Sequence, residues 1–449
     1  MAAVATLRRS LWSVFTSSQA VRARLARNTF WSIAGSASSQ GSSLLAAVVV
    51  ARLLGTARFG QLALIQATVL LTGTLGEMGL TLTTTKFVSR WRVTDPERAG
   101  RLMGWSLRTI ATSGLIMAAL LAGMQPYIKI SGLAGLSKEI SAGCGLLLFD
   151  MLNRVQLGAL GGLEQFGSTA RIQLARGLLM LPCVWLGTWR SGLLGAVLAM
   201  AFVSLATFVI GHWVLRSKCR SLLIPLRYWG AREPEILTTS MSLWMGALLL
   251  AGSSWIVTVL LSREPSGLSE LGLYNAADKW KTALLFLPNQ LFQVTLPMLS
   301  YSQGAGDHRA CRRIISAALI SALGVTGAGA ILVFSLSRVL MSSYGVGFTQ
   351  GASVLSLAAL VAVTSAIYTV GSSALWALGK PTQMLGIDIL KTFLHLGLCW
   401  IGYASSARNL MLAYLLSSSA GCVVVMFAVW RHLEIQMTTT DAIQVEESS

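Results

Sequence analysis

The feature that most constrains this 449-residue sequence is its succession of apolar stretches, each long enough to cross a bilayer. A helix needs about 20 mostly apolar residues to span the hydrocarbon core. By this measure the sequence predicts an all-α polytopic membrane protein with twelve transmembrane helices. The predicted helices lie near residues 28–51, 60–85, 102–124, 140–163, 166–188, 192–215, 236–262, 273–300, 314–337, 349–378, 382–404 and 409–430.

The composition excludes several other classes of protein. Only 12% of the residues are charged and 54% are hydrophobic, whereas soluble domains carry about 25% charged residues. The chain is therefore expected to be neither a disordered protein nor an ordinary cytosolic enzyme. Its six cysteines are widely spaced. We expect buried free thiols, because zinc and redox sites need paired spacing.

The distribution of positive charge predicts the orientation in the membrane. The chain carries 35 Lys and Arg against 17 Asp and Glu. With the amino terminus in the cytoplasm, 22 basic residues fall in the first tail and the cytoplasmic connections, and only eight fall in the opposite loops. Basic residues concentrate on the cytoplasmic side of membrane proteins. Both termini are therefore predicted to be cytoplasmic, and the positive excess indicates anionic lipid rather than nucleic acid as the partner.

The longest polar connection divides the predicted helices into two equal sets. Gly60 lies 35 residues before Asp95, and Gly272 lies 35 residues before Asp307, each pair in a corresponding place of its half. This equal spacing in the two halves suggests a parallel repeat, and such repeats place a binding cavity at their interface. We expect a basic cytoplasmic segment at 1–27, an N-lobe at 28–215, a cytoplasmic inter-lobe loop at 216–235, a C-lobe at 236–431 and a cytoplasmic acidic tail at 432–449.

The first segment has a second interpretation. It is rich in Arg and Ser, and the first acidic residue of the chain is Glu77. An amphipathic stretch on the cytoplasmic membrane surface would have this composition, and so would an organelle transit peptide.

Charged residues inside the predicted spans are the candidate site residues. An ionised side chain at the bilayer centre costs roughly 2.5–3.5 kcal/mol, so it normally faces a cavity or a partner. Three acid–base pairs lie three or four residues apart, which places each pair on one helix face. The pairs are Asp150 with Arg154, Asp278 with Lys281 (Lys279 lies beside them) and Asp388 with Lys391.

These pairs allow two interpretations. The partners neutralise each other and so reduce the cost of insertion, or the bases make a cavity electropositive and bind phosphate or glycan anions. The candidate substrate-binding residues are Arg154, Lys279, Lys281 and Lys391.

Acidic residues within spans are candidates for H⁺ or Na⁺ coupling. These are Glu77, Asp150, Asp278 and Asp388. Glu77 has no basic neighbour in its own span, which makes it the best of the four. The alternative for Glu77 is a hydrogen bond to Ser or Thr on a neighbouring helix.

Catalytic signatures are missing from the sequence. It contains no P-loop, no GxSxG and no HExxH, and its four histidines are scattered. We therefore predict no catalytic residue, no metal site and no cofactor. Pro182, Pro288 and Pro297 fall within predicted spans, where each predicts a static kink or a hinge.

Three stretches resemble a known family. They are "VVVARLLGTARFGQLALIQ" (48–66), "LSELGLYNAADKWKTALLFLPNQLFQVTLPMLS" (268–300) and "ALGKPTQML" (377–385). They are similar to Wzx-type polysaccharide flippases of the multidrug/oligosaccharidyl-lipid/polysaccharide (MOP) superfamily.

The resemblance implies two six-helix lobes around a central cavity, as in MATE transporters. It also implies translocation of an undecaprenyl-diphosphate-linked oligosaccharide from the inner to the outer leaflet of the bacterial plasma membrane, for exopolysaccharide or O-antigen synthesis. The implied partners are the lipid-linked oligosaccharide, the bilayer, H⁺ or Na⁺, and a polysaccharide polymerase with chain-length proteins.

Other functions remain as alternatives. A cation-coupled MATE-like exporter of small molecules would need an acidic pocket, whereas the embedded acids and bases are balanced here. A membrane glycosyltransferase or polymerase would usually show a long external loop. The remaining alternatives are a lipid scramblase and a structural membrane protein.

Overall fold

The computed structural model describes residues 2–123, 136–226, 234–290, 295, 299, 302–303 and 308–448, with side chains between Gly35 and Glu434. These residues form helices joined by short turns. The α-helices are α1 (Ala2–Glu77), α2 (Leu80–Thr94), α3 (Pro96–Gly123), α5 (Ser137–Gly162), α6 (Phe166–Ser221), α7 (Pro234–Ser262), α8 (Gly267–Leu284), α10 (His308–Ser335), α11 (Ser337–Ser342), α12 (Ala352–Ala377), α13 (Pro381–Trp400) and α14 (Ala407–Ser448). Two short 3₁₀ helices, η1 (Val346–Gly351) and η2 (Tyr403–Ser405), precede α12 and α14.

Glycine breaks the two longest helices. The backbone of α1 leaves helical geometry at Gly55 (φ 73°), and that of α6 does so at Ser191 and Gly192 (φ 58°). A positive φ is readily accessible only to glycine. Both breaks fall between apolar stretches that the sequence predicted as separate spans.

A third break contradicts the predicted span at 60–85. Met78 (φ 50°) and Gly79 (φ 71°) interrupt it and separate α1 from α2. A Cβ on Gly79 would overlap the carbonyl oxygen of Ser240 in α7, so the close approach of α7 fixes glycine at this turn. The predicted spans at 102–124 and 273–300 extend beyond the described residues, and Pro297 lies outside them.

Within the described residues, seven helices are long and apolar enough to cross a membrane: Gly35–Glu77, Pro96–Gly123, Phe166–Ser221, Glu235–Ser262, Ala310–Ser335, Val346–Ala377 and Ala407–His432. The chain is therefore an all-helical membrane protein. Many large apolar side chains lie on the outside, including Trp213 at 74% exposure and Ile320 at 72%. Such side chains can face lipid, because lipid tails are as apolar as they are.

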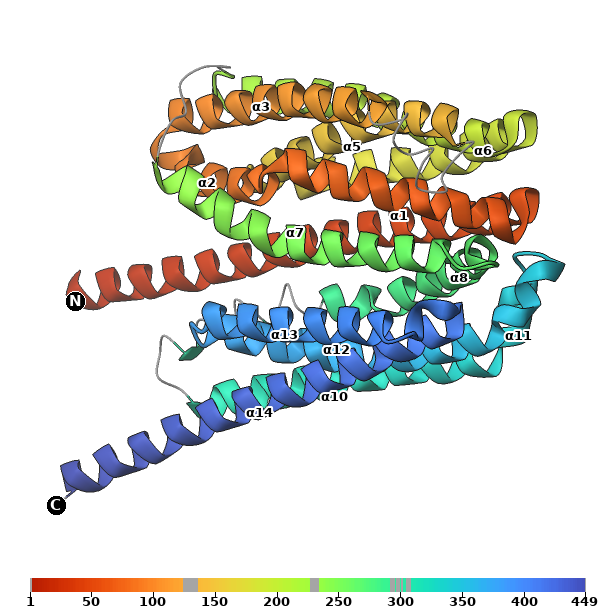
Figure 1. The fold of residues 1–449 in the computed structure, drawn as a ribbon. Coiled ribbons are helices and arrows are strands. Elements are labelled where there is room, and N and C mark those ends of the chain that lie inside the picture. The colour runs from red at the N-terminus through yellow and green to blue at the C-terminus, as the bar shows by residue number, and fades with distance from the viewer. Residues whose placement is uncertain are drawn as a thin grey trace.

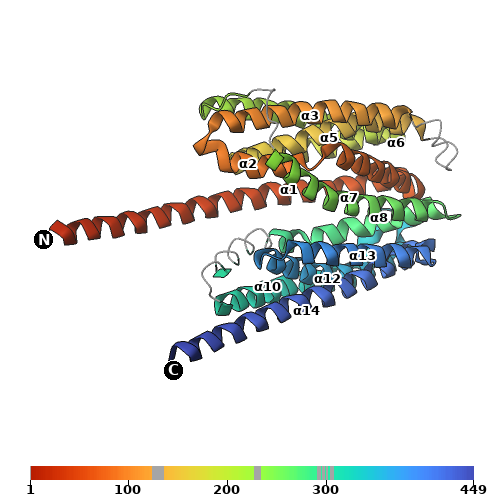
Figure 2. The ribbon, with the colours of Figure 1, turned by 60° about the vertical axis from the view of Figure 1, so that its left-hand side comes forward.

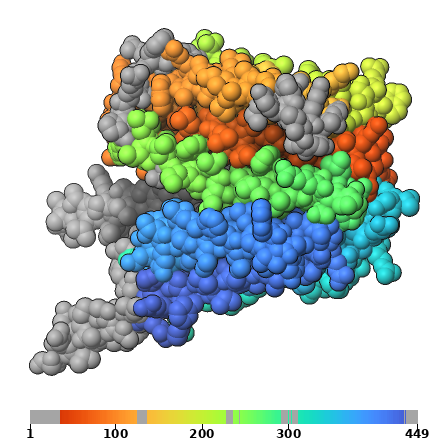
Figure 3. Space-filling view, viewed as in Figure 1, coloured from red at the N-terminus to blue at the C-terminus, as the bar shows by residue number. Residues whose placement is uncertain are grey.

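The helices form two groups with α7 and α8 between them (Figure 1). The first helix group consists of α1, α2, α3, α5 and α6, with α1 and α5 packed on α6. The second helix group consists of α10, α12, α13 and α14, with α12 packed on α10 and α14. Helix α7 contacts α1 and α13, and α8 contacts α1 and α12. Figure 3 shows the green α7 and α8 between the two groups. The outer ends of α1 and α14 lie at the same end of the molecule (Figures 1 and 2).

A reciprocal glycine contact joins α1 to α8 at the end opposite the termini. A Cβ on Gly60 would overlap the carbonyl oxygen of Leu268, and a Cβ on Gly272 would overlap that of Thr56. Each glycine thus packs against the residue four positions before the other one. We call these four residues the glycine contact. Only residues without a side chain allow two helices to approach this closely.

Aromatic packing surrounds the glycine contact. The ring of Phe59 makes edge contacts with Tyr344 and Phe348, at centroid distances of 6.4 and 5.9 Å. All three side chains are at most 3% exposed. Arg52 also donates a hydrogen bond to the carbonyl of Ser343. Residues of α1 and of the α11–η1 segment therefore close this end of the molecule together.

Candidate functional site

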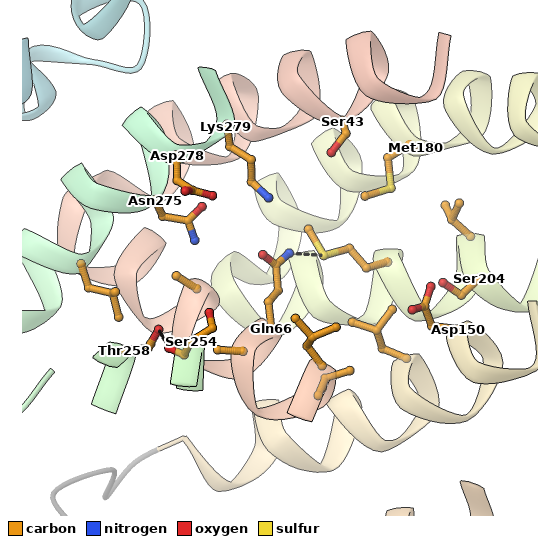
Figure 4. A pocket seen from close by; sticks show the side chains of 18 of the residues that line it. Ser43, Gln66, Asp150, Met180, Ser204, Ser254, Thr258, Asn275, Asp278 and Lys279 are labelled. Carbon is orange, nitrogen blue, oxygen red and sulfur yellow. Dashed lines mark hydrogen bonds between the residues drawn. The ribbon is translucent and has the colours of Figure 1, made fainter. Parts of the chain in front are cut away.

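A cavity lies between the first helix group and the pair α7 and α8. We call it the central cavity. Its volume of about 430 Å³ lies in the range of roughly 300–1,000 Å³ that small-molecule sites occupy. Residues of α1, α5 and α6 line one side, and residues of α7 and α8 line the other (Figure 4). The charged residues of its wall are Asp150, Arg154, Arg176, Asp278 and Lys279.

Asp150 of α5 organises the charges on one side of this cavity. Its Oδ2 accepts hydrogen bonds from Arg154 Nε at 3.1 Å and Nη2 at 3.0 Å. Its Oδ1 accepts one from Arg176 Nη2 of α6 at 3.0 Å. Two guanidinium groups are thus held side by side by one carboxylate. Charge-assisted hydrogen bonds of this kind are the stronger class, and they fix the direction of each fork.

Glu77 has a basic partner from another helix, so the lack of a basic neighbour in its own span does not leave it unpaired. Its Oε2 lies 3.8 Å from Arg154 Nη1, and its side chain is 16% exposed. The partner comes from α5, far from Glu77 in sequence. Glu77, Arg154, Asp150 and Arg176 form one alternating chain of charges across three helices.

Arg176 was not among the predicted site residues, because it lies near the start of a predicted span and was counted with the cytoplasmic connections. A signal was available: position 176 lies inside the predicted span at 166–188. An arginine within a span deserves the same treatment as the other embedded charges.

Helix α8 supplies the opposite wall of the central cavity. In Figure 4, Asp278 and Lys279 extend from α8 toward the space that Gln66 of α1 borders. Asp278 forms an ion pair with Lys281, as the three-residue spacing predicted. Lys279 is half-buried and has no acidic partner among the described residues.

A smaller cavity of about 280 Å³ lies on the other side of α7 and α8, against α13 and α14. We call it the second cavity. Ser254, Thr258, Tyr274 and Asp278 line both cavities, so the two adjoin. The charged residues around the second cavity are Asp278, Lys281 and Lys391, and its other polar groups include His395, Tyr414 and four serines.

The predicted pair of Asp388 with Lys391 is not among the ion pairs of the described residues. Instead, Asp388 Oδ1 accepts a hydrogen bond from Tyr368 at 2.5 Å. The ammonium group of Lys391 lies over the ring of the same tyrosine, 4.0 Å from its centroid. Tyr368 of α12 thus stands between two groups that the helix spacing placed together.

The charges around the two cavities are predominantly basic. Counting each residue once, the walls hold five basic side chains and two carboxylates. Among the described residues, no group of three or more His, Cys, Asp and Glu side chains is placed to hold a metal ion. The cysteines at positions 144, 183, 219, 311, 399 and 422 are free thiols.

This fold is the fold of MATE transporters. The chain matches a solved inward-facing MATE transporter of the MOP superfamily with a TM-score of 0.78, at 14% identity over 89% of this chain and 96% of that one. An outward-facing structure matches with a TM-score of 0.69, at 14% identity over 92% and 96%. A MOP superfamily transporter from Pyrococcus furiosus, described as having a binding pocket of reverse polarity, matches with a TM-score of 0.69, at 15% identity over 92% and 96%.

The chain belongs to the polysaccharide biosynthesis protein family, whose pattern matches residues 25–303. This match confirms the family resemblance seen in the sequence. One relative is the EPS I polysaccharide export inner membrane protein EpsE of Ralstonia nicotianae, 22% identical over 374 residues, which are 79% of this chain and 81% of that one. The EpsE protein of Ralstonia solanacearum is 28% identical over 167 residues, which are 35% of this chain and 36% of that one.

Proposed function

We propose that this protein is a flippase, a transporter rather than an enzyme, that moves an undecaprenyl-diphosphate-linked oligosaccharide from the inner to the outer leaflet. The observation that carries this proposal is the pair of adjoining cavities with five basic side chains and two carboxylates in their walls. Membership in the polysaccharide biosynthesis family supports the glycan part of the proposal. The name of the EpsE relatives supports polysaccharide export across a bacterial inner membrane.

The basic side chains match the chemistry of a lipid diphosphate. In a membrane cavity of low dielectric, water screens an anion poorly, so fixed cations must replace its hydration. Arg154 and Arg176 present two forks that Asp150 already orients, and a planar guanidinium binds phosphate oxygens in pairs. Lys279 adds a point charge from the opposite wall. The diphosphate would therefore bind between α5, α6 and α8.

The proposed architecture has twelve transmembrane helices in two six-helix lobes. The breaks at Gly55 and Gly192, which divide α1 and α6 into separate apolar segments, support this count. The common end of α1 and α14 supports placing both termini in the cytoplasm. The higher TM-score against the inward-facing structure supports an inward-facing arrangement, with the glycine contact closing the outer end.

Ion coupling is assigned to Glu77 in this proposal. Asp150 accepts three close hydrogen bonds, Asp278 pairs with Lys281, and Asp388 accepts from Tyr368. Glu77 lies 3.8 Å from its basic partner, the loosest of these arrangements. A weakly held acidic residue within a span is the natural site for a coupling ion.

A basic cavity argues against the MATE-like exporter of cationic small molecules. Like charges repel, so a cationic drug would pay an electrostatic cost where a lipid diphosphate gains. The proposal also includes transient contact with a polysaccharide polymerase and with chain-length proteins, which would use the released substrate.

The test is complementation of a strain that lacks the gene. We expect Lys279→Ala and Arg154→Ala to reduce surface polysaccharide at least tenfold, because each removes a cation from the path of the diphosphate. Lys380→Ala is the matched control, since Lys380 is an exposed lysine at the start of α13. Membrane fractions must contain equal amounts of each protein. Normal polysaccharide in both cavity variants would refute the electropositive path.

A further inference from the structure

Lys391 is the charged residue of the second cavity that has no ion pair among the described residues. Lys281 forms an ion pair with Asp278 and lies over the ring of Tyr414, so its charge is already compensated. Lys391 lines the same cavity and has no acidic partner among the described residues. A buried or half-buried ammonium group without a counter-charge is costly in a membrane protein. A ligand that carries a negative charge would offset this cost.

Neighbouring residues keep Lys391 unpaired. Asp388 lies one turn away on the same helix face and would be its natural partner. The Tyr368 hydroxyl holds the Asp388 carboxylate instead, and the Tyr368 ring lies under the Lys391 ammonium group. The lysine stem runs past Gly421 of α14, where a Cβ would meet its Cδ at 3.0 Å. Residues of α12, α13 and α14 thus hold the Lys391 ammonium group at the second cavity without an acidic partner in the described part of the chain.

The remaining wall of the second cavity suits a sugar. Serine and threonine hydroxyls from α7, α13 and α14 line it, together with the rings of Tyr274, Tyr414 and His395. Hydroxyl groups match sugar hydroxyls as donors and acceptors. Aromatic rings offer a flat apolar surface with a polar edge. A cavity of 280 Å³ is close to the lower end of the small-molecule range, at roughly 300 Å³.

We propose that the second cavity is a separate oxyanion site, in which Lys391 binds a carboxylate or phosphate group carried by the glycan of the substrate. This proposal rests on the flippase function and adds that the glycan is acidic. The central cavity, with its paired guanidinium forks, takes the diphosphate, and the single ammonium group takes a single charged group on a sugar. Because the cavities share Tyr274 and Asp278, one substrate can reach both.

The test uses the full-length protein purified in detergent. Its thermal unfolding midpoint is followed against increasing sodium glucuronate, sodium phosphate or glucose, with sodium chloride to hold ionic strength constant. A ligand that binds only the folded protein raises the midpoint, and the rise grows with the logarithm of its concentration above its Kd. We expect glucuronate to raise the midpoint of the wild-type protein, and glucose at the same concentrations to have much less effect.

Three variants locate the site. Lys391→Met should need at least tenfold more glucuronate for the same shift, because a charge-assisted hydrogen bond is lost. Lys380→Met, the exposed control, should behave as wild type. Tyr368→Phe keeps the ring but removes the hydroxyl that holds Asp388. Asp388 can then pair with Lys391, so Tyr368→Phe should also weaken glucuronate binding. Tyr368 itself does not line the second cavity.

The phosphate arm identifies the source of the oxyanion. If Lys391→Met weakens glucuronate and leaves the phosphate response intact, the second cavity binds an acidic sugar and the phosphate response belongs to the central cavity. If both responses weaken together, Lys391 binds phosphate as well as carboxylate, and the proposal stands with a phosphate group on the glycan as the occupant. An unchanged glucuronate response in Lys391→Met, or no glucuronate response in the wild type, overturns the proposal. The flippase function is tested separately, by polysaccharide export in Lys279→Ala and Arg154→Ala.

Discussion

Replacing Gly60 with alanine should separate α1 from α8 at the glycine contact. The added Cβ would overlap the Leu268 carbonyl oxygen and would lie 2.8 Å from its carbonyl carbon and 3.0 Å from the Gly272 nitrogen. Favourable contacts between non-bonded heavy atoms lie at about 3.5–4.0 Å. The overlap with the Leu268 carbonyl oxygen is the largest of these clashes, so the helices must move apart by more than about 1 Å. Overpacking of this kind costs about 1–3 kcal/mol, which lowers the population of the closed arrangement by about 5- to 150-fold.

Accessibility of a buried reporter measures this shift. Ala63 lies one turn beyond Gly60 and is 5% exposed, so Ala63→Cys reports separation of the helices when the native cysteines are replaced. In intact cells, a membrane-impermeant maleimide should label the Gly60→Ala protein about 5 to 150 times faster than its parent. Gly41→Ala is the matched control on the same helix, since nothing lies within 4 Å of a Cβ there. Equal labelling rates for all three proteins would refute the closed outer end.

Three further predictions concern charge and orientation. Asp150→Asn should lower the thermal unfolding midpoint and reduce export, because Arg154 and Arg176 would face each other without their shared carboxylate. Each charged hydrogen bond contributes about 1.5–3 kcal/mol. An unchanged midpoint would contradict this prediction. Glu77→Gln should make polysaccharide export insensitive to an ionophore that collapses the proton or sodium gradient, and a response equal to wild type would exclude Glu77 as the coupling site. A reporter enzyme inserted in the 216–235 loop should report a cytoplasmic location. Reporter activity on the outer side of the membrane would overturn the orientation.

The sequence predicted the positions of most helices because apolar length and hydropathy are local properties of the chain. The break at Gly55 lies in the gap between two predicted spans, and the break at Ser191 and Gly192 lies at the start of the predicted span 192–215, so both fall where a boundary was expected. The break at Gly79 lies inside an apolar run, at a point where the backbone of Ser240 in another helix leaves no room for a side chain. A conformation imposed by tertiary contact leaves no periodic signal in its own segment.

The candidate site shows the same division between local and distant information. Spacing within one helix correctly predicted that Asp150 pairs with Arg154, since residues four apart share a face. It failed for Asp388, because Tyr368 from α12 competes for the carboxylate. The partner of Glu77 also comes from another helix. Embedded charges can be recognised from sequence, but their pairing requires the packed bundle.

The glycine contact has the form of an interface between two identical subunits. Gly60 meets Leu268 while Gly272 meets Thr56, and such mutual exchange of the same surface is what a two-fold axis produces in a homodimer. Fusion of two half-length ancestors would preserve this junction while freeing each copy to change. Six residues beyond the two glycines stand Gln66 and Asp278, both in the cavity wall. The corresponding position is neutral in one half and acidic in the other. A homodimer of one gene product could not encode this difference.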